Sequence, residues 1–124
     1  MPEVRRRVFV VDDETTIATT LALILNSHGF DAKAFTDPYD ALYSAEVHSP
    51  DVLLTDVSMP KLNGIDLGVQ FKAIFPECKV LLFSGHANTA NLRQSAADTG
   101  HHFDLIAKPI QPKDLIATIE SMVV

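Results

Sequence analysis

Two apolar patterns alternate along this sequence, and their alternation restricts the folds that it can form. One pattern is a short, nearly continuous apolar run, which is typical of a parallel strand covered on both faces. The other is a longer segment with apolar residues at helical spacing, which indicates a helix with one buried face. The short runs that predict strands are residues 8–11, 52–54, 80–83 and 103–107.

Helical patterns lie between and after these runs. They are bounded by residues that commonly start or stop helices, such as Gly29, Pro76 and Pro112. Helices in these places would connect each parallel strand to the next. The segments that predict them are residues 17–25, 67–74 and 115–122.

Other segments complete the alternation with weaker signals. Residues 31–35 alternate polar and apolar side chains, which predicts a half-exposed edge strand, and residues 38–47 predict a short helix after it. Residues 87–98 are rich in small side chains and only weakly amphipathic, so we expect their helix to be the least firmly held. The complete order predicts an open, doubly wound α/β sheet.

Length and composition fit one domain of this kind. The chain has 124 residues, 47% of them hydrophobic, so we expect residues 1–124 to form a single domain with no output domain. No apolar segment is long enough for a membrane span, and the net charge of −6 disfavours nucleic acid as a partner. Cys78 is the only cysteine; we expect it to be buried, and its being alone fits a cytoplasmic protein.

Polar side chains follow the predicted strands, at the edge of such a sheet where ligands bind. Asp12 and Asp13 follow the first strand, Asp56 the third, Ser84 the fourth and Lys108 the fifth. Carboxylates grouped at this edge suit Mg²⁺, which would offset their mutual repulsion. A metal, a lysine, a hydroxyl and a carboxylate nucleophile are together the groups that phosphoryl transfer to an aspartate requires.

Each of these residues also has an ordinary structural interpretation when it is taken alone. Asp13 could be the N-cap of the helix that follows it, and Asp56 could cap a turn. Ser84 could satisfy a main-chain group, and Lys108 could be a solvated surface lysine. The conjunction of all of them at one edge favours the functional interpretation.

Several motifs resemble those of the receiver domains of two-component response regulators. They are VVDDE at residues 10–14, LLTDVSMPKLNG at 53–64, LLFSGHA at 81–87 and AKPI at 107–110. The resemblance covers essentially the whole chain. It implies a flavodoxin-like (βα)5 fold, with five parallel strands in the order 2-1-3-4-5.

The resemblance also implies roles for individual residues. Asp56 would be the phosphoacceptor, and Mg²⁺, or Mn²⁺ in its place, would bind Asp13, Asp56 and the main-chain carbonyl of Ser58, with Asp12 helping through water. Ser84 and Lys108 would contact the phosphoryl group. The Lys108–Pro109 peptide bond would be cis, which aims the lysine at the site.

The implied function is that of a regulatory switch and not of an enzyme with its own turnover. The phosphoryl group would come from a sensor histidine kinase or a histidine phosphotransfer protein in the cytoplasm. Phosphorylation would then change how the face made by the helix at 87–98, the fifth strand and the final helix binds a downstream protein or a second copy. No contact with nucleic acid or membrane is expected of this domain.

The chain departs from the family pattern near the fifth strand. Leu105 stands three residues before the lysine, where the family usually has Tyr or Phe as a rotamer switch. Strand alternation would put Phe103 on the same face as Leu105, which leaves a partial substitution open. Ser58 and His86 occupy positions at which the family resemblance implies an influence on phosphoryl lifetime. The adjacent pair His101 and His102 is expected to be solvated, as are His28 and His48.

Rival functions share parts of this pattern. A flavin-binding electron carrier would have the same topology, but it needs a phosphate cradle where this chain has acids after the first strand. An aspartyl-phosphate phosphatase would have the same chemistry, but its usual D-x-D nucleophile motif is absent from the first strand. An interaction domain that is independent of phosphorylation would not need the group of polar residues at the strand ends.

Gly64, after the turn residue Asn63, is expected to meet a steric requirement and not to bind a ligand.

Overall fold

The computed structural model describes residues 5–85, 94, 97, 100 and 103–123. Within these residues, five parallel strands form one sheet in the order β2-β1-β3-β4-β5. This confirms the doubly wound α/β fold and the strand order that the sequence predicts. The strands are β1 (Arg7–Val11), β2 (Asp31–Phe35), β3 (Val52–Asp56), β4 (Lys79–Ser84) and β5 (Asp104–Ala107).

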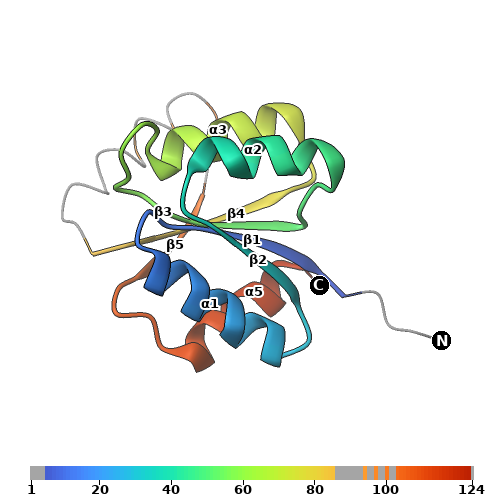
Figure 1. Cartoon of the computed structure of the whole chain (residues 1–124), viewed down its shortest axis with the longest axis vertical. Helices are drawn as coiled ribbons and strands as arrows, with labels where there is room; N and C mark the ends of the chain where they lie inside the picture. Colours follow the sequence, from blue (N-terminus) through green and yellow to red (C-terminus); the bar gives the residue numbers. More distant parts are fainter. Residues whose placement is uncertain (1–4, 86–93, 95–96, 98–99, 101–102, 124) are drawn as a thin grey trace.

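Helices cover both faces of the sheet (Figure 1). Helices α1 (Thr15–Ser27) and α5 (Pro112–Met122) lie on one face, and α2 (Pro38–Val47) and α3 (Gly64–Ile74) lie on the other. None of the helices among the described residues has the length and apolarity that crossing a membrane would require. The helix predicted over residues 87–98 falls outside the described residues except for Gln94 and Ala97.

Local sequence explains where several helices begin. The side chain of Asp37, the N-cap of α2, accepts a 2.9 Å hydrogen bond from the N–H of Tyr39. Asn63 caps α3 in the same way, by accepting from the N–H of Asp66 at 2.8 Å. Helices α2 and α5 begin with Pro38 and Pro112. Proline lacks an N–H, which costs nothing at this position because an N–H in the first turn has no acceptor within the helix.

The sheet separates two apolar cores. On the α2 and α3 side, Phe9 of β1 and Leu53 of β3 pack with Phe71 of α3. On the α1 and α5 side, the next residues along the strands, Val10 and Leu54, pack with buried residues of both helices. Because β1 and β3 lie between these cores, their positions are fixed from both faces.

Cys78 is buried as expected, with 2% of its surface exposed. Burial raises the pKa of its thiol to about 11. The thiol is therefore neutral at physiological pH, and its role is that of a small apolar side chain.

The outer edge of β2 is partly closed by a side chain of α1. The amide of Asn26 donates to the main-chain oxygen of Ala32 at 3.1 Å and accepts from the N–H of Ala32 at 2.8 Å. These bonds satisfy main-chain groups that an edge strand would otherwise offer to another chain.

Strand register brings the predicted functional residues to one edge of the sheet. Val11, which precedes Asp12, is paired with Thr55, which precedes Asp56. On the other side of β3, Asp56 is paired with Phe83, which precedes Ser84. Since the strands are parallel, all of these residues lie where their strands end.

Candidate functional site

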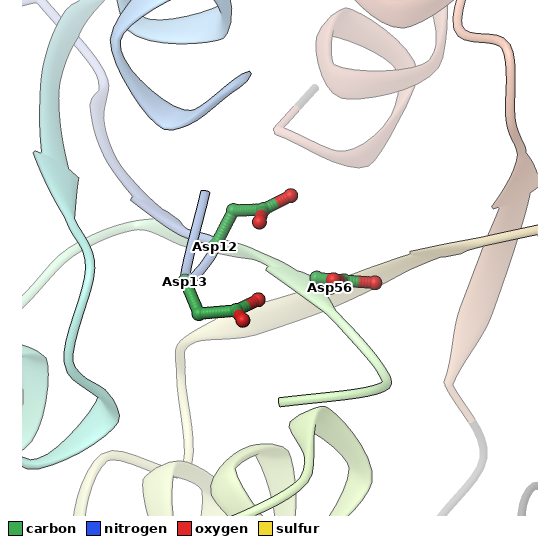
Figure 2. A group of neighbouring side chains, drawn as sticks. All are labelled: Asp12, Asp13 and Asp56. Atoms are coloured by element: carbon green, nitrogen blue, oxygen red, sulfur yellow. The ribbon is translucent and has the colours of Figure 1, made fainter. Parts of the chain in front are cut away.

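Three carboxylates form an acidic cluster at the carboxyl ends of β1 and β3: Asp12, Asp13 and Asp56 (Figure 2). One carboxylate oxygen from each lies within 4.8 Å of the others. Asp12 is fully buried and Asp56 is 5% exposed, whereas Asp13 is exposed. The cluster therefore has a buried base and one carboxylate at its open side.

Asp12 is the most strongly perturbed acid of the cluster. Its pKa is raised from 3.8 to about 6, chiefly by burial and in addition by the nearby carboxylates of Asp56 and Asp13. Two contacts oppose this effect: the Oδ1 atom accepts a 2.8 Å hydrogen bond from the N–H of Glu14, and the Oδ2 atom lies 3.7 Å from Nζ of Lys108. Oδ2 is buried without a hydrogen-bond partner.

Asp56 is held through its main chain while one side-chain oxygen remains unsatisfied. The buried hydroxyl of Thr55 donates to the main-chain oxygen of Asp56 at 2.9 Å. The Oδ1 atom of Asp56 is buried without a hydrogen bond, but Nζ of Lys108 lies 3.3 Å away. A buried carboxylate oxygen that has no hydrogen bond and lies beside a cation is suited to bind or attack an electrophile.

Gly64 explains how α3 can begin directly beside this carboxylate. A Cβ atom at this position would lie 2.0 Å from the main-chain oxygen of Asp56 and 3.0 Å from Cα of Val57. The N–H of Gly64 donates to the oxygen of Val57 at 2.8 Å. The expected steric requirement for glycine is therefore confirmed, and its cause is the backbone of Asp56 itself.

Lys108 approaches the acidic cluster from the opposite side. It follows β5, and the Lys108–Pro109 peptide bond is cis, as predicted. The ammonium group lies between Asp12 and Asp56 at the distances given above and 5.0 Å from the centre of the Phe83 ring. Ser84 is buried, and its main-chain oxygen accepts a 3.2 Å hydrogen bond from the N–H of Lys108.

The ordinary interpretations of these residues fare differently. The N-cap of α1 is Glu14 and not Asp13, and the Glu14 side chain makes no capping hydrogen bond. Lys108 is not a solvated surface lysine, because 29% of its side chain is exposed and its ammonium group contacts two buried carboxylates. Asp12, Asp13, Asp56 and Lys108 are therefore brought together as the sequence predicts.

An apolar groove of about 520 Å³ adjoins the acidic cluster on the side of Lys108. It lies between α1 and the connection from β5 to α5. Its lining residues are Thr16, Ile17, Thr20, Leu21, Phe83, Lys108, Pro109 and Ile110.

The unusual residues near β5 occupy different environments. Phe103 is buried in the core on the α2 and α3 side, against Gly68: a Cβ there would lie 3.1 Å from the Phe103 ring. It precedes the strand, which begins at Asp104 and not at residue 103 as predicted. Leu105 is 38% exposed. Ser58, His28 and His48 are also exposed, whereas His86, His101 and His102 lie outside the described residues.

Two contributors to the site are absent from the sequence-based prediction. Thr55 reads as an ordinary polar residue of a strand, and only the structure shows its hydroxyl on the main chain of Asp56. Phe83 reads as a core residue, although its ring also lies under the ammonium group of Lys108. The one sequence signal that Thr55 and Phe83 share is that each directly precedes a predicted site residue, Asp56 and Ser84 respectively.

With fold and geometry together, the class of protein is defined. The chain belongs to the response regulator receiver domain family, whose model matches residues 8–120. A receiver domain of a two-component response regulator is a regulatory domain and not a classical enzyme, and this membership displaces the flavin-carrier and phosphatase interpretations.

Comparison with individual proteins agrees with this assignment. The chain is 31% identical to the DNA-binding response regulator MtrA of Mycobacterium tuberculosis over 124 residues, which cover 98% of this chain and 52% of MtrA. It is 30% identical to the transcriptional regulatory protein CreB of Escherichia coli over 118 residues, which cover 95% of this chain and 51% of CreB. The chain thus spans about half the length of these curated relatives.

Solved structures show the same likeness. A response regulator receiver domain protein from Clostridium thermocellum superposes with a TM-score of 0.84 at 29% identity and covers 95% of this chain and 94% of its own. A CheY-like receiver domain protein from Methanospirillum hungatei has a TM-score of 0.86 at 23% identity, with 97% and 94% covered. The second likeness concerns the fold alone.

The acidic cluster fits the divalent cation that this family implies. Its oxygen ligands are of the hard type that Mg²⁺ prefers. Two of these oxygens, Oδ2 of Asp12 and Oδ1 of Asp56, are buried without hydrogen bonds, which is costly for ionised carboxylates unless a cation compensates.

Proposed function

We propose that this domain is a signalling switch that is phosphorylated on Asp56. The observation that carries the proposal is the Oδ1 atom of Asp56, which is buried, has no hydrogen bond and faces the ammonium group of Lys108 at 3.3 Å. The donor would be a phosphohistidine of a sensor histidine kinase or of a histidine phosphotransfer protein.

In the proposed reaction, a carboxylate oxygen of Asp56 attacks phosphorus in line with the phosphorus–nitrogen bond of the donor. An oxygen–phosphorus bond forms while the phosphorus–nitrogen bond breaks. The electron pair of the broken bond goes to the imidazole nitrogen, which takes up a proton. The product is an acyl phosphate on Asp56.

Side chains around Asp56 would hold the transferred group. Lys108 would pair with a phosphoryl oxygen in place of its present contact with Asp56, and the Ser84 hydroxyl would donate to another oxygen. Asp12, Asp13, Asp56 and the main-chain carbonyl of Ser58 would hold Mg²⁺, or Mn²⁺ in its place. When bound, the metal supplies neutralisation of the charge on the transferred group.

The apolar groove beside Lys108 offers a place for the donor protein. Because the groove is lined by Lys108, whose ammonium group lies 3.3 Å from Asp56, a donor protein bound there would lie close to the acceptor carboxylate. Burial of groove residues such as Ile17 and Ile110 would add apolar contact to this encounter.

The output of the switch is also part of the proposal. Phosphorylation in the cytoplasm would draw Ser84 toward the phosphoryl group and change how the face that includes β5 and α5 binds a downstream protein or a second copy. The helix predicted over residues 87–98 would belong to that face. MtrA is named a DNA-binding regulator, but the net charge of −6 argues against nucleic acid as a partner of this domain.

Phosphorylation can be tested with a small donor. Wild-type protein and the Asp56→Asn variant are incubated with Mg²⁺ and acetyl phosphate and then measured by intact mass spectrometry. We expect the wild type to gain one phosphoryl group and the variant to gain none, because an amide is not a nucleophile for phosphorus.

A matched control is Asp104→Asn, which removes an exposed strand carboxylate away from the acidic cluster. It should be phosphorylated like the wild type. Equal phosphorylation of the wild type and Asp56→Asn, or none in the wild type, would contradict the proposed function.

A further inference from the structure

The segment that follows Asp56 is tied to a distant part of the chain by an ion pair. Lys61 lies in this segment, and its ammonium group contacts Oδ2 of Asp37, the N-cap of α2. The other oxygen of the same carboxylate accepts the hydrogen bond from Tyr39 that caps the helix. One carboxylate therefore caps α2 and also holds the segment after Asp56.

Lys61 has an unusual backbone conformation. Its φ of 73° is in the left-handed region, and among the described residues it is the non-glycine residue with a positive φ. A side chain with a Cβ disfavours this region, so the conformation persists where surrounding contacts fix it. Strained residues of this kind concentrate at functional sites, and Lys61 lies in the segment that joins Asp56 to α3.

Other contacts fix the two ends of the same segment. At one end, the N–H of Gly64 donates to the oxygen of Val57 at 2.8 Å. Within it, Met59 and Leu62 pack against the core on the α2 and α3 side. Ser58, in contrast, is exposed. The contact between Lys61 and Asp37 is thus a polar restraint on the outer part of the segment that carries Ser58.

In the ion pair of Lys61 and Asp37, each charged group favours the ionised form of the other. The hydrogen bond from Lys61 lowers the pKa of Asp37, and the same bond raises the pKa of Lys61. Both groups therefore remain ionised throughout the neutral pH range, so the restraint is present under the conditions in which the acidic cluster would bind a cation.

We infer that Lys61 is a positioning residue for divalent metal binding: its ion pair with Asp37 holds residues 57–63 in the conformation that presents the main-chain carbonyl of Ser58 to the metal. This inference rests on the proposed function, in which that carbonyl is a metal ligand. Neither Lys61 nor Asp37 contacts the metal in this arrangement. The pair acts by keeping the ligand in place before the metal arrives.

Two substitutions remove the ion pair with little other change. Lys61→Asn removes the charge but keeps a residue that tolerates the left-handed region. Asp37→Asn removes the opposite charge but keeps an N-cap. The Mg²⁺ dissociation constant of each is measured by isothermal titration calorimetry at low ionic strength, together with Lys61→Arg, which retains the pair.

Each asparagine variant is expected to bind Mg²⁺ about threefold more weakly than the wild type, because exposed pairs of this kind make a modest contribution. Either substitution alone breaks the ion pair, so the double variant should bind Mg²⁺ no more weakly than either single variant. Lys61→Arg should bind like the wild type. Added sodium chloride should reduce the difference between the wild type and the asparagine variants, because it screens the pair.

The outcomes separate this inference from the proposed function. Normal Mg²⁺ binding by the wild type, with unchanged binding by both asparagine variants or with additive losses, would overturn the role of the pair alone. Absence of Mg²⁺ binding by the wild type would overturn the metal site and this inference together. Thermal unfolding of each variant shows whether a loss of binding reflects a loss of folded protein.

Discussion

Asp56 and Lys108 face each other across the site, but the elements that hold them leave very different amounts of room. On the Asp56 side, a Cβ at Gly64 would overlap the main-chain oxygen of Asp56 at 2.0 Å. On the Lys108 side, a Cβ at Gly85 would meet Cβ of Lys108 at 3.6 Å, which is an ordinary contact. In the proposed reaction, the main chain that carries the attacking carboxylate is therefore held closely, whereas the groups that would move onto the phosphoryl group have space to do so.

The position of the strands in the sheet explains this difference. Strand β3 lies in the middle of the sheet, and all of its residues are buried. Strand β5 lies at an edge, and most of its residues are exposed. A nucleophile needs a constant position for in-line attack, and a cation that follows the transferred charge needs freedom to adjust.

The largest predicted effect concerns the tight packing of Gly64 against Asp56. Gly64→Ala should destabilise the fold by about 3 kcal/mol or more, because backbone must shift to relieve the overlap with Asp56. Helix propensity alone would favour alanine here by up to about 1 kcal/mol, so a loss has a steric cause. Urea unfolding monitored by circular dichroism measures the change.

Gly85→Ala is the matched substitution on the Lys108 side. It should change the free energy of unfolding by less than about 1 kcal/mol, since the new methyl group meets only an ordinary contact. Similar losses in the two variants would show that the two sides do not differ in packing. A stable Gly64→Ala protein would show that α3 can move away from Asp56.

A second prediction concerns the buried carboxylate of Asp12, which lies beside both Asp56 and Lys108. Because the pKa of Asp12 is about 6 in the folded protein and ordinarily 3.8, the folded state keeps this proton to a higher pH than the unfolded chain does. Stability that depends on Asp12 is therefore present below about pH 4 and is lost as the pH rises through 6. A shift of this size corresponds to at most about 3 kcal/mol.

The measurement compares the wild type with Asp12→Asn in unfolding experiments without divalent ions, from pH 4 to pH 7. The difference isolates Asp12 from acids whose pKa moves the other way, such as Asp37. The variant should become progressively more stable than the wild type as the pH rises. Added Mg²⁺ should then stabilise the wild type more than the variant. A difference that is independent of pH would contradict the prediction.

The sequence predicts the fold and most of the site because both depend on short-range patterns. Buried parallel strands are continuous apolar runs, and residues that follow such runs necessarily meet at one edge of the sheet. Asp12, Asp56 and Lys108 could be found for this reason. The steric role of Gly64 could also be expected, because a helix must start soon after Asp56.

Contacts between segments that are far apart in the sequence could not be predicted in this way. Lys61 and Asp37 are separated by 24 positions, and neither residue type indicates the other as its partner. The hydroxyl of Thr55 and the closure of β2 by Asn26 likewise depend on side-chain directions that no periodicity encodes. The same limit applies to β5, where a buried Phe103 precedes the strand instead of beginning it.

The smallest predicted effect concerns the Lys108 side of the site. Lys108→Met should destabilise the protein by only about 1 kcal/mol at pH 7, because a partly exposed ammonium group contributes less than a fully buried one. Lys108 lowers the pKa of Asp12, so its removal should raise that pKa above 6. The part of the loss that acts through Asp12 should therefore appear above pH 6 and vanish near pH 4, where Asp12 is protonated in both proteins, whereas the contact of Lys108 with Asp56 is separate. NMR titration of Asp12 and unfolding at both pH values measure these effects, with Lys108→Arg as the variant that keeps the charge. A loss that is the same at pH 4 and pH 7 would show that Lys108 does not act on stability through Asp12. A loss as large as that of Gly64→Ala would show that the Lys108 side of the site contributes as much to stability as the packing around Asp56.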